Sequence, residues 1–170
     1  MNIWKSVGIL VFGLTLGCGG SSKSDSQETG DTGETPAPED IICAMRGDAG
    51  LTMTPGMTAS STAPAIMELD SPYTIQLTPT TGGWVRLVIP EAGNYTIHTG
   101  FVEVMTGLWI DTEAVPLAEP TSNPSCPTEI PEVFALRVQT PQTYYMQLGP
   151  LSSMSFWILV HREADTADEV

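Results

Sequence analysis

The segment Trp84-Val-Arg-Leu-Val-Ile-Pro-Glu-Ala-Gly-Asn-Tyr-Thr-Ile-His-Thr99 decides the fold class of this chain. Apolar residues alternate with polar or smaller ones in WVRLVI and again in NYTIHT, as in strands that bury one face. Between these two runs, PEAG at positions 90–93 supplies turn chemistry, because proline fixes φ and glycine accepts positive φ. The segment therefore predicts two short strands joined by a turn.

Runs of the same kind continue on both sides of this segment. They are predicted as strands at 73–78, 101–105, 108–111, 133–138, 143–148 and 155–161. Gly- and Pro-containing turns separate them, and no amphipathic helix of any length is predicted. Short strands at such spacing are typical of an all-β sandwich or barrel. We expect an all-β fold, a single two-sheet β-sandwich with jelly-roll-like connections.

The chain has 170 residues, and only its central part has the pattern of a folded domain. A single Lys5 followed by an uncharged run to Gly17 is typical of a secretory signal, and the run is too short to cross a bilayer. The predicted segments are a signal peptide over 1–17, a disordered linker over 18–40, the β-sandwich over 41–162 and a disordered acidic tail over 163–170. The domain, about 120 residues long, has the commonest size for one hydrophobic core.

The end of the signal, Leu14-Thr-Leu-Gly-Cys18, resembles the lipobox of bacterial lipoproteins. The resemblance implies cleavage before Cys18, diacylation of its thiol with palmitate-like chains, and acylation of the new amino terminus. Two or more acyl chains anchor a protein stably, so the lipid bilayer is an expected partner. Gly19 after the cysteine favours the outer over the inner membrane of the cell envelope. The alternative is an ordinary secretory signal with Cys18 near the cleavage point by chance.

The charge of the chain argues against two classes of partner. Its net charge is −14, and half of its 20 acidic residues lie in the linker and the tail. The linker contains no aliphatic residue larger than Ala37, so it cannot bury enough apolar surface to fold. No basic patch is present for nucleic acid or anionic lipid, and we expect binding to neither.

Apart from Cys18, the chain has two cysteines, Cys43 and Cys126. An even pair in an exported domain predicts a disulfide bond. The alternative is a pair of metal-binding or redox thiols, which neither a Cys-x-x-Cys spacing nor a neighbouring histidine supports. The predicted bond would join the start of the domain to the Pro-rich segment 116–131.

Two motifs in the domain resemble the bacterial pre-peptidase C-terminal type of β-sandwich. The first is EAGNYTI, with Ala92, Gly93, Tyr95 and Ile97 at matching positions, and the second is TYYMQLG, with Tyr144, Tyr145, Leu148 and Gly149. The resemblance covers roughly 69–161 and implies an accessory module of exported proteins, with roles in adhesion, targeting or polymer binding. We therefore expect a non-catalytic binding module that contacts an envelope protein or an extracellular polymer.

Metal binding is an alternative function, although no cofactor is predicted. Met53, Met57 and His98 are weak candidates for a Cu(I) site, because thioether ligands select Cu(I). Asp111 and Glu113 could offer oxygen ligands to Ca²⁺.

The competing interpretation is that Met45 and Met67 fill gaps in the core and that Met53 and Met57 lie in a loop. A strand-end histidine such as His98 is usually a solvated surface residue, and no catalytic residue is predicted. A hydrolase accessory or degenerate enzyme is the second alternative.

Overall fold

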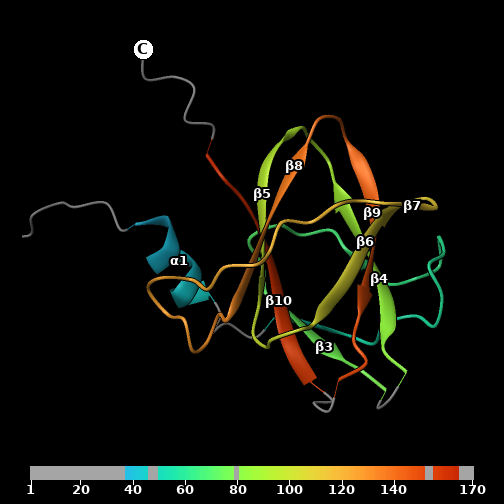
Figure 1. The fold of residues 1–170 in the computed structure, drawn as a ribbon, viewed down its shortest axis with the longest axis horizontal. Coiled ribbons are helices and arrows are strands. Elements are labelled where there is room, and N and C mark those ends of the chain that lie inside the picture. Colours follow the sequence, from blue (N-terminus) through green and yellow to red (C-terminus); the bar gives the residue numbers. More distant parts are fainter. Residues whose placement is uncertain (1–36, 46–49, 79–80, 152–154, 165–170) are drawn as a thin grey trace, which may run out of the picture. The chain divides into compact units, whose positions relative to one another are not determined.

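Two five-stranded β-sheets pack against each other in the structure, a computed structural model that describes residues 37–45, 50–78, 81–151 and 155–164 (Figure 1). One short helix, α1 (Pro38–Met45), precedes the strands. The predicted all-β sandwich is confirmed. The signal peptide, Cys18, the linker up to residue 36 and the end of the acidic tail lie outside the described residues. No helix of the described segments has the length and apolar character that a membrane span requires.

The two sheets have the strand connectivity of a jelly roll. Sheet A has the order β1-β3-β10-β5-β8 and sheet B the order β2-β4-β9-β6-β7. The strands of sheet A are β1 (Leu51–Met53), β3 (Tyr73–Gln76), β10 (Ser155–Arg162), β5 (Gly93–Thr99) and β8 (Glu132–Val138). Those of sheet B are β2 (Ala65–Ile66), β4 (Gly83–Ile89), β9 (Gln142–Leu148), β6 (Met105–Ile110) and β7 (Glu113–Ala114). From β3 to β6 and from β8 to β10 each strand lies in the sheet opposite to the preceding one, as in a double-sheet jelly roll.

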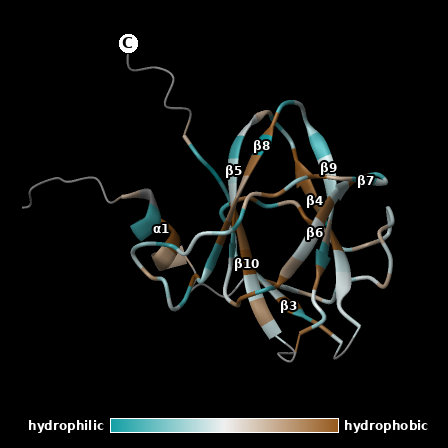
Figure 2. Ribbon diagram, viewed as in Figure 1, coloured by the Kyte–Doolittle hydropathy of each residue, from teal (hydrophilic) through white to brown (hydrophobic). Residues whose placement is uncertain are grey.

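The main core lies between the two sheets and is built by the alternation seen in the sequence. Val85, Leu87 and Ile89 in β4 are each at most 1 % exposed, and Tyr95 and Ile97 in β5 face them from sheet A. Figure 2 shows hydrophobic residues gathered in the strands, for example in β10. Each strand buries one face because side chains alternate across a sheet.

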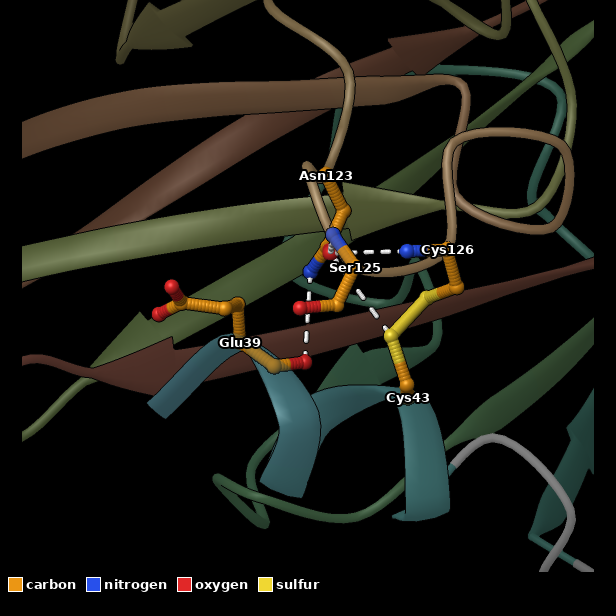
Figure 3. The surroundings of a disulfide bond; sticks show 5 residues. All are labelled: Glu39, Cys43, Asn123, Ser125 and Cys126. Atoms are coloured by element: carbon orange, nitrogen blue, oxygen red, sulfur yellow. Dashed lines mark hydrogen bonds between the residues drawn. A yellow bond between two sulfur atoms is a disulfide. The ribbon is translucent and has the colours of Figure 1, made fainter. Parts of the chain in front are cut away.

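Helix α1 was not predicted, and the linker was expected to remain disordered as far as Asp40. Its apolar residue Ile42 is 2 % exposed and packs with Ile130 and with Leu159, which lies on the outer face of sheet A. The neighbouring Cys43 forms the predicted disulfide bond with Cys126 (Figure 3). A helix of eight residues is marginal in isolation, so these long-range contacts stabilise it.

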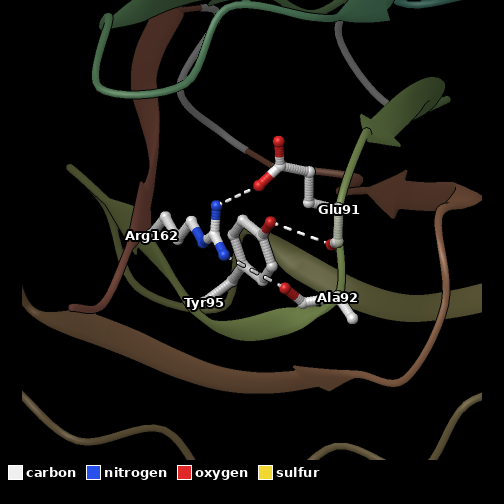
Figure 4. Close-up of polar contacts among 4 residues, drawn as sticks. All are labelled: Glu91, Ala92, Tyr95 and Arg162. Atoms are coloured by element: carbon white, nitrogen blue, oxygen red, sulfur yellow. Dashed lines mark hydrogen bonds and ion pairs between the residues drawn. The ribbon is translucent and has the colours of Figure 1, made fainter. Parts of the chain in front are cut away.

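The predicted turn at 90–93 is present and is held by two side chains (Figure 4). The hydroxyl of Tyr95 donates to the carbonyl oxygen of Glu91 at 3.0 Å. The guanidinium of Arg162, at the end of β10, forms an ion pair with the Glu91 carboxylate and donates to the carbonyl of Ala92 at 3.3 Å. Gly93 has φ of +155°, and a Cβ there would lie 3.2 Å from Nε of Arg162. Ala92 and Gly93 thus close a turn that packs against Arg162 at the end of β10.

Two predicted strands, 101–105 and 108–111, are wrong as separate elements. Residues 101–104 form a turn, and one strand, β6, runs from Met105 to Ile110. The chain bends at Glu103, whose φ is +56° and whose N–H donates to the buried carboxylate of Glu132 at 2.8 Å. The strands β1, β2 and β7 were missed, because two or three residues are too few to show alternation.

Candidate ligand-binding groove

The outer face of sheet A, the face away from the main core, carries polar side chains next to α1. In the register of β5 and β10, His98 pairs with Leu159 and Thr96 pairs with His161, so these four side chains point outward. Val133 of β8 lies opposite His98 on the other side and belongs to the same face. The outer face therefore presents two histidines among apolar neighbours.

A groove of about 820 Å³ lies on this face. Its lining includes Thr96, His98 and Val133 from the strands, Ile42 from α1, and Asn123 from the segment between β7 and β8. Helix α1 and the segment around Asn123 thus contribute to the wall of the groove, and the sheet contributes Thr96, His98 and Val133. This volume falls in the range of pockets that hold small ligands.

Helix α1 and the segment that precedes β8 are joined to each other by Asn123, which is 2 % exposed (Figure 3). Its Oδ1 accepts the N–H groups of Ser125 at 2.9 Å and Cys126 at 3.2 Å, and its Nδ2 donates to the carbonyl of Glu39 in α1 at 3.5 Å. The Sγ atom of Cys43 lies 3.6 Å from Oδ1. Because a disulfide sulfur carries no hydrogen, this is a contact and not a hydrogen bond. The disulfide and Asn123 together hold α1 against the segment 123–126, and both segments line the groove.

His98 is the most unusual side chain of the groove, because it is only 5 % exposed. Its Nε2 lies 2.8 Å from Oγ1 of Thr96, whereas its buried Nδ1 has no hydrogen-bond partner among the described residues. Burial, and secondarily the charge of His161, lowers the pKa of His98 from 6.5 to about 4. The ring is therefore neutral at neutral pH. An unpaired buried nitrogen is costly, so His98 occupies an energetically unfavourable environment beneath the groove.

Charged groups surround the opening of the groove. Nδ1 of His161 lies 2.5 Å from Oδ1 of Asp70, and Arg162 is paired with Glu91. Two further lining residues, Glu39 and Glu163, form no ion pair with a described residue. The uncompensated charge around the groove is therefore negative, and an anionic ligand is disfavoured.

The structure separates the candidate copper ligands. Met53, in β1, is half-buried against the main core, on the face of sheet A opposite to His98. Met57 is 70 % exposed in the segment between β1 and β2. The expectation that Met67 fills a core gap is wrong, since it is 65 % exposed, while Met45 is half-buried and packs near Ile42.

Of the candidate calcium ligands, Asp111 lies in the tight turn between β6 and β7, and Glu113 is the first residue of β7. Asp111, with φ of +52°, and Glu113 are both exposed. Within the described ranges, no three His, Cys, Asp or Glu side chains converge as metal ligands. The turn explains the spacing of these two acids without a metal.

The expectation that His98 is a solvated surface residue is wrong. Alternation placed it correctly on the outer face of β5, but α1 and the segment around Asn123 cover that face. The sequence signal that was available is the cysteine pair, which predicts that the start of the domain lies against the Pro-rich segment. His161 has Asp70 as its partner, yet no described hydroxyl or thiol forms a hydrogen bond with His161, as an activated nucleophile would.

No protein-family model matches this chain, and a search of curated proteins gives no match either. The geometry and chemistry of the groove are therefore the basis for a functional assignment. They combine a concave volume, apolar lining residues such as Ile42 and Val133, and two acidic residues, Glu39 and Glu163. These are properties of a binding site.

Proposed function

We propose that this protein is a membrane-anchored exported lipoprotein whose β-sandwich is a non-catalytic binding module at the cell envelope. The observation that carries the binding role is the groove of about 820 Å³, lined by strands of sheet A, by α1 and by the segment around Asn123. The disulfide between Cys43 and Cys126 supports an exported location, because such bonds persist in oxidising compartments. The partner is an envelope protein or an extracellular polymer.

The membrane anchor rests on the sequence around Cys18, which resembles a lipobox. Acylation of Cys18 would tether the domain through the acidic linker, which leads into α1. Since α1 contributes to the wall of the groove, the tether would enter the domain beside the proposed binding site. The outer membrane is the proposed location.

Mass spectrometry of the mature amino terminus tests the anchor. The full chain is expressed in a bacterial host that processes lipoproteins, and the amino-terminal peptide is analysed. We expect it to begin at Cys18 and to carry the mass of three acyl chains. The Cys18→Ser variant is expected to lose both the acyl mass and the membrane fraction. An unmodified amino terminus at any other residue contradicts the anchor.

A groove-filling variant tests the binding role. Thr96→Tyr places a ring in the lining of the groove, whereas Thr112→Tyr alters the exposed turn between β6 and β7 of sheet B and is the matched control. Binding of both variants to solubilised envelope proteins and to purified envelope polysaccharides is compared with that of the wild-type protein. We expect Thr96→Tyr alone to lose binding. Equal binding by both variants rules out the groove as the site.

A further inference from the structure

The outer face of sheet B carries three aromatic side chains that the proposed groove does not use. Trp84, Tyr145 and Trp109 come from the adjacent strands β4, β9 and β6. In the register, Trp109 of β6 pairs with Tyr145 of β9. Trp84 of β4 pairs with Gln147, which follows Tyr145 by two residues in β9. Their chain neighbours point into the core, so these side chains point outward, and all three rings are half-buried. We call Trp84, Trp109 and Tyr145 the aromatic surface.

The indole of Trp109 lies flat on the sheet, and the indole of Trp84 lies beside it at an angle. A Cβ at Gly107 would lie 1.9 Å from Cη2 and 2.4 Å from Cζ3 of Trp109. The six-membered ring of Trp109 therefore lies directly over the backbone of its own strand, and only glycine leaves room for it. The ring centroids of Trp84 and Trp109 are 5.0 Å apart and the ring planes are inclined by 59°. Trp84 thus stands at an angle beside the flat ring of Trp109.

Polar groups without negative charge border these rings. Gln147 lies between Trp84 and Gly107 in the register, and Arg86 pairs with Tyr145. The Nε of Arg86 donates to the carbonyl of Ala63 at 2.8 Å, which holds the guanidinium beside the aromatic surface. The described register partners of Trp84, Trp109 and Tyr145 within the strands include no Asp or Glu, and the exposed Glu113 of β7 is paired with Ile110 instead.

We propose that the aromatic surface binds a glycan, a chain of neutral pyranose sugars. One face of a pyranose ring presents C–H groups, whose hydrogens are attracted to the negative π-face of an indole. The hydroxyl groups at the edge of the sugar then meet the amide of Gln147, which donates and accepts, and the donors of Arg86. The surface lies on the sheet opposite to the groove, so this site is additional to the proposed binding function.

The shape of the surface favours a glycan over a protein partner. Aromatic anchors of protein interfaces insert into pockets of the partner, whereas the ring of Trp109 lies flat over Gly107. A flat apolar ring with hydrogen-bonding groups along its edge is complementary to a sugar, which has an apolar face and a polar perimeter. Nucleic acid would also stack on such rings, but the net charge of −14 opposes it.

Tryptophan fluorescence provides the test, with soluble oligosaccharides of β-linked glucose and of N-acetylglucosamine as probes. The purified mature protein carrying Trp157→Phe is the reference, because Trp157 lies in β10 of sheet A and its signal would obscure the others. We expect saturable fluorescence changes with at least one probe. Trp109→Ala in this reference should weaken binding roughly tenfold or more, a change of one decade in Kd.

Gly107→Ala is the more specific variant, because it keeps both indoles but displaces that of Trp109 from the sheet. We expect a similar loss of affinity, and Gln147→Ala should lower the affinity severalfold at an unchanged melting temperature. Thr96→Tyr, which fills the groove, should bind the oligosaccharides normally. Retention gels that contain the polymers give a second measurement for any variant with altered fluorescence.

Four outcomes would overturn the inference. One is the absence of binding to every oligosaccharide and polymer. Another is full binding by both Trp109→Ala and Gly107→Ala. Loss of glycan binding in Thr96→Tyr alone would place the glycan in the groove, which supports the proposed function but removes the second site. Self-association that disappears with Trp109→Ala, without glycan binding, would identify the surface as a contact between copies.

Discussion

Cys43, in the first helix, is covalently bound to Cys126, which lies 83 residues later in the segment before β8. The bond fixes a helix of eight residues onto the outer face of a sheet whose other face forms the main core. A second, smaller apolar cluster forms there around Ile42, Ile130 and Leu159. The disulfide thus holds together two of the segments that line the groove.

Removal of the disulfide should destabilise the domain and open the groove. In the double variant Cys43→Ala, Cys126→Ala the unfolded chain is no longer restricted by the bond. The free energy of unfolding should therefore fall by about 2–4 kcal/mol, the typical contribution of a disulfide. Urea unfolding measures this loss. Limited proteolysis should cut α1 early in the variant and late in the wild-type protein. Equal stability together with equal protection of α1 would contradict the role given to this bond.

His98 should make the domain less stable in acid. Its pKa is about 4 in the folded state and 6.5 in the unfolded chain, so between these values only the unfolded state takes up the proton. The free energy of unfolding therefore falls as the pH drops from about 6.5 to about 4, by at most about 3 kcal/mol. Urea unfolding at several pH values measures this, and His98→Gln should lose this part of the dependence.

The charge of His161 contributes to the low pKa of His98, so a second variant separates the two causes. His161→Gln should reduce the acid sensitivity only in part, because burial is the larger cause. If His98→Gln and the wild-type protein show the same pH dependence of stability, His98 does not remain neutral in the fold.

The hydroxyl of Tyr95 should stabilise the turn between β4 and β5. Tyr95→Phe removes the hydrogen bond to the carbonyl of Glu91 and should cost about 1 kcal/mol. Tyr145→Phe is the control, because the Tyr145 hydroxyl forms no hydrogen bond with a described residue, and it should change stability by less than about 0.5 kcal/mol. Thermal melts of the two variants measure the difference in stability. A larger effect at Tyr145 would show that the turn does not depend on this bond.

Glu132 should stabilise the bend that precedes β6. Its carboxylate is buried, accepts the N–H of Glu103 at 2.8 Å and lies 3.5 Å from the hydroxyl of Thr99. Glu132→Ala leaves these donors without their partner and should cost about 1–3 kcal/mol. Glu132→Gln keeps an acceptor oxygen and should cost less. Chemical denaturation measures the loss of stability in both variants. A greater loss in Glu132→Gln than in Glu132→Ala would show that the Glu132 carboxylate does not stabilise the bend as an acceptor.

The strands of the core were predictable because each carries its own signal. The alternation in 84–89 and 94–99 identifies both the strand and its buried face, and β8, β9 and β10 followed the same rule. The bend at Glu103 was not predictable, because its partner Glu132 lies 29 residues later. The segment 101–105, FVEVM, therefore has the sequence pattern of an additional strand.

The candidate site was predictable only in part. The cysteine pair predicted which two segments meet, but not that α1 forms or which sheet face it covers. His98 was placed on the correct face and given the wrong environment, because alternation does not reveal what covers an outward-facing residue. Likewise, Trp84 and Trp109 lie 25 residues apart, and neither has a sequence signal that connects it to the other.

Alternation along the chain and the number of cysteines are enough to identify the fold class, the inward faces of the strands and the cysteine pairing, because these are local or countable properties. Only the tertiary structure decided that the outer face of sheet A is covered by α1, that His98 is buried there, and that the ring of Trp109 lies over Gly107 beside Trp84. These features depend on contacts between distant segments, which form only when the sheets assemble.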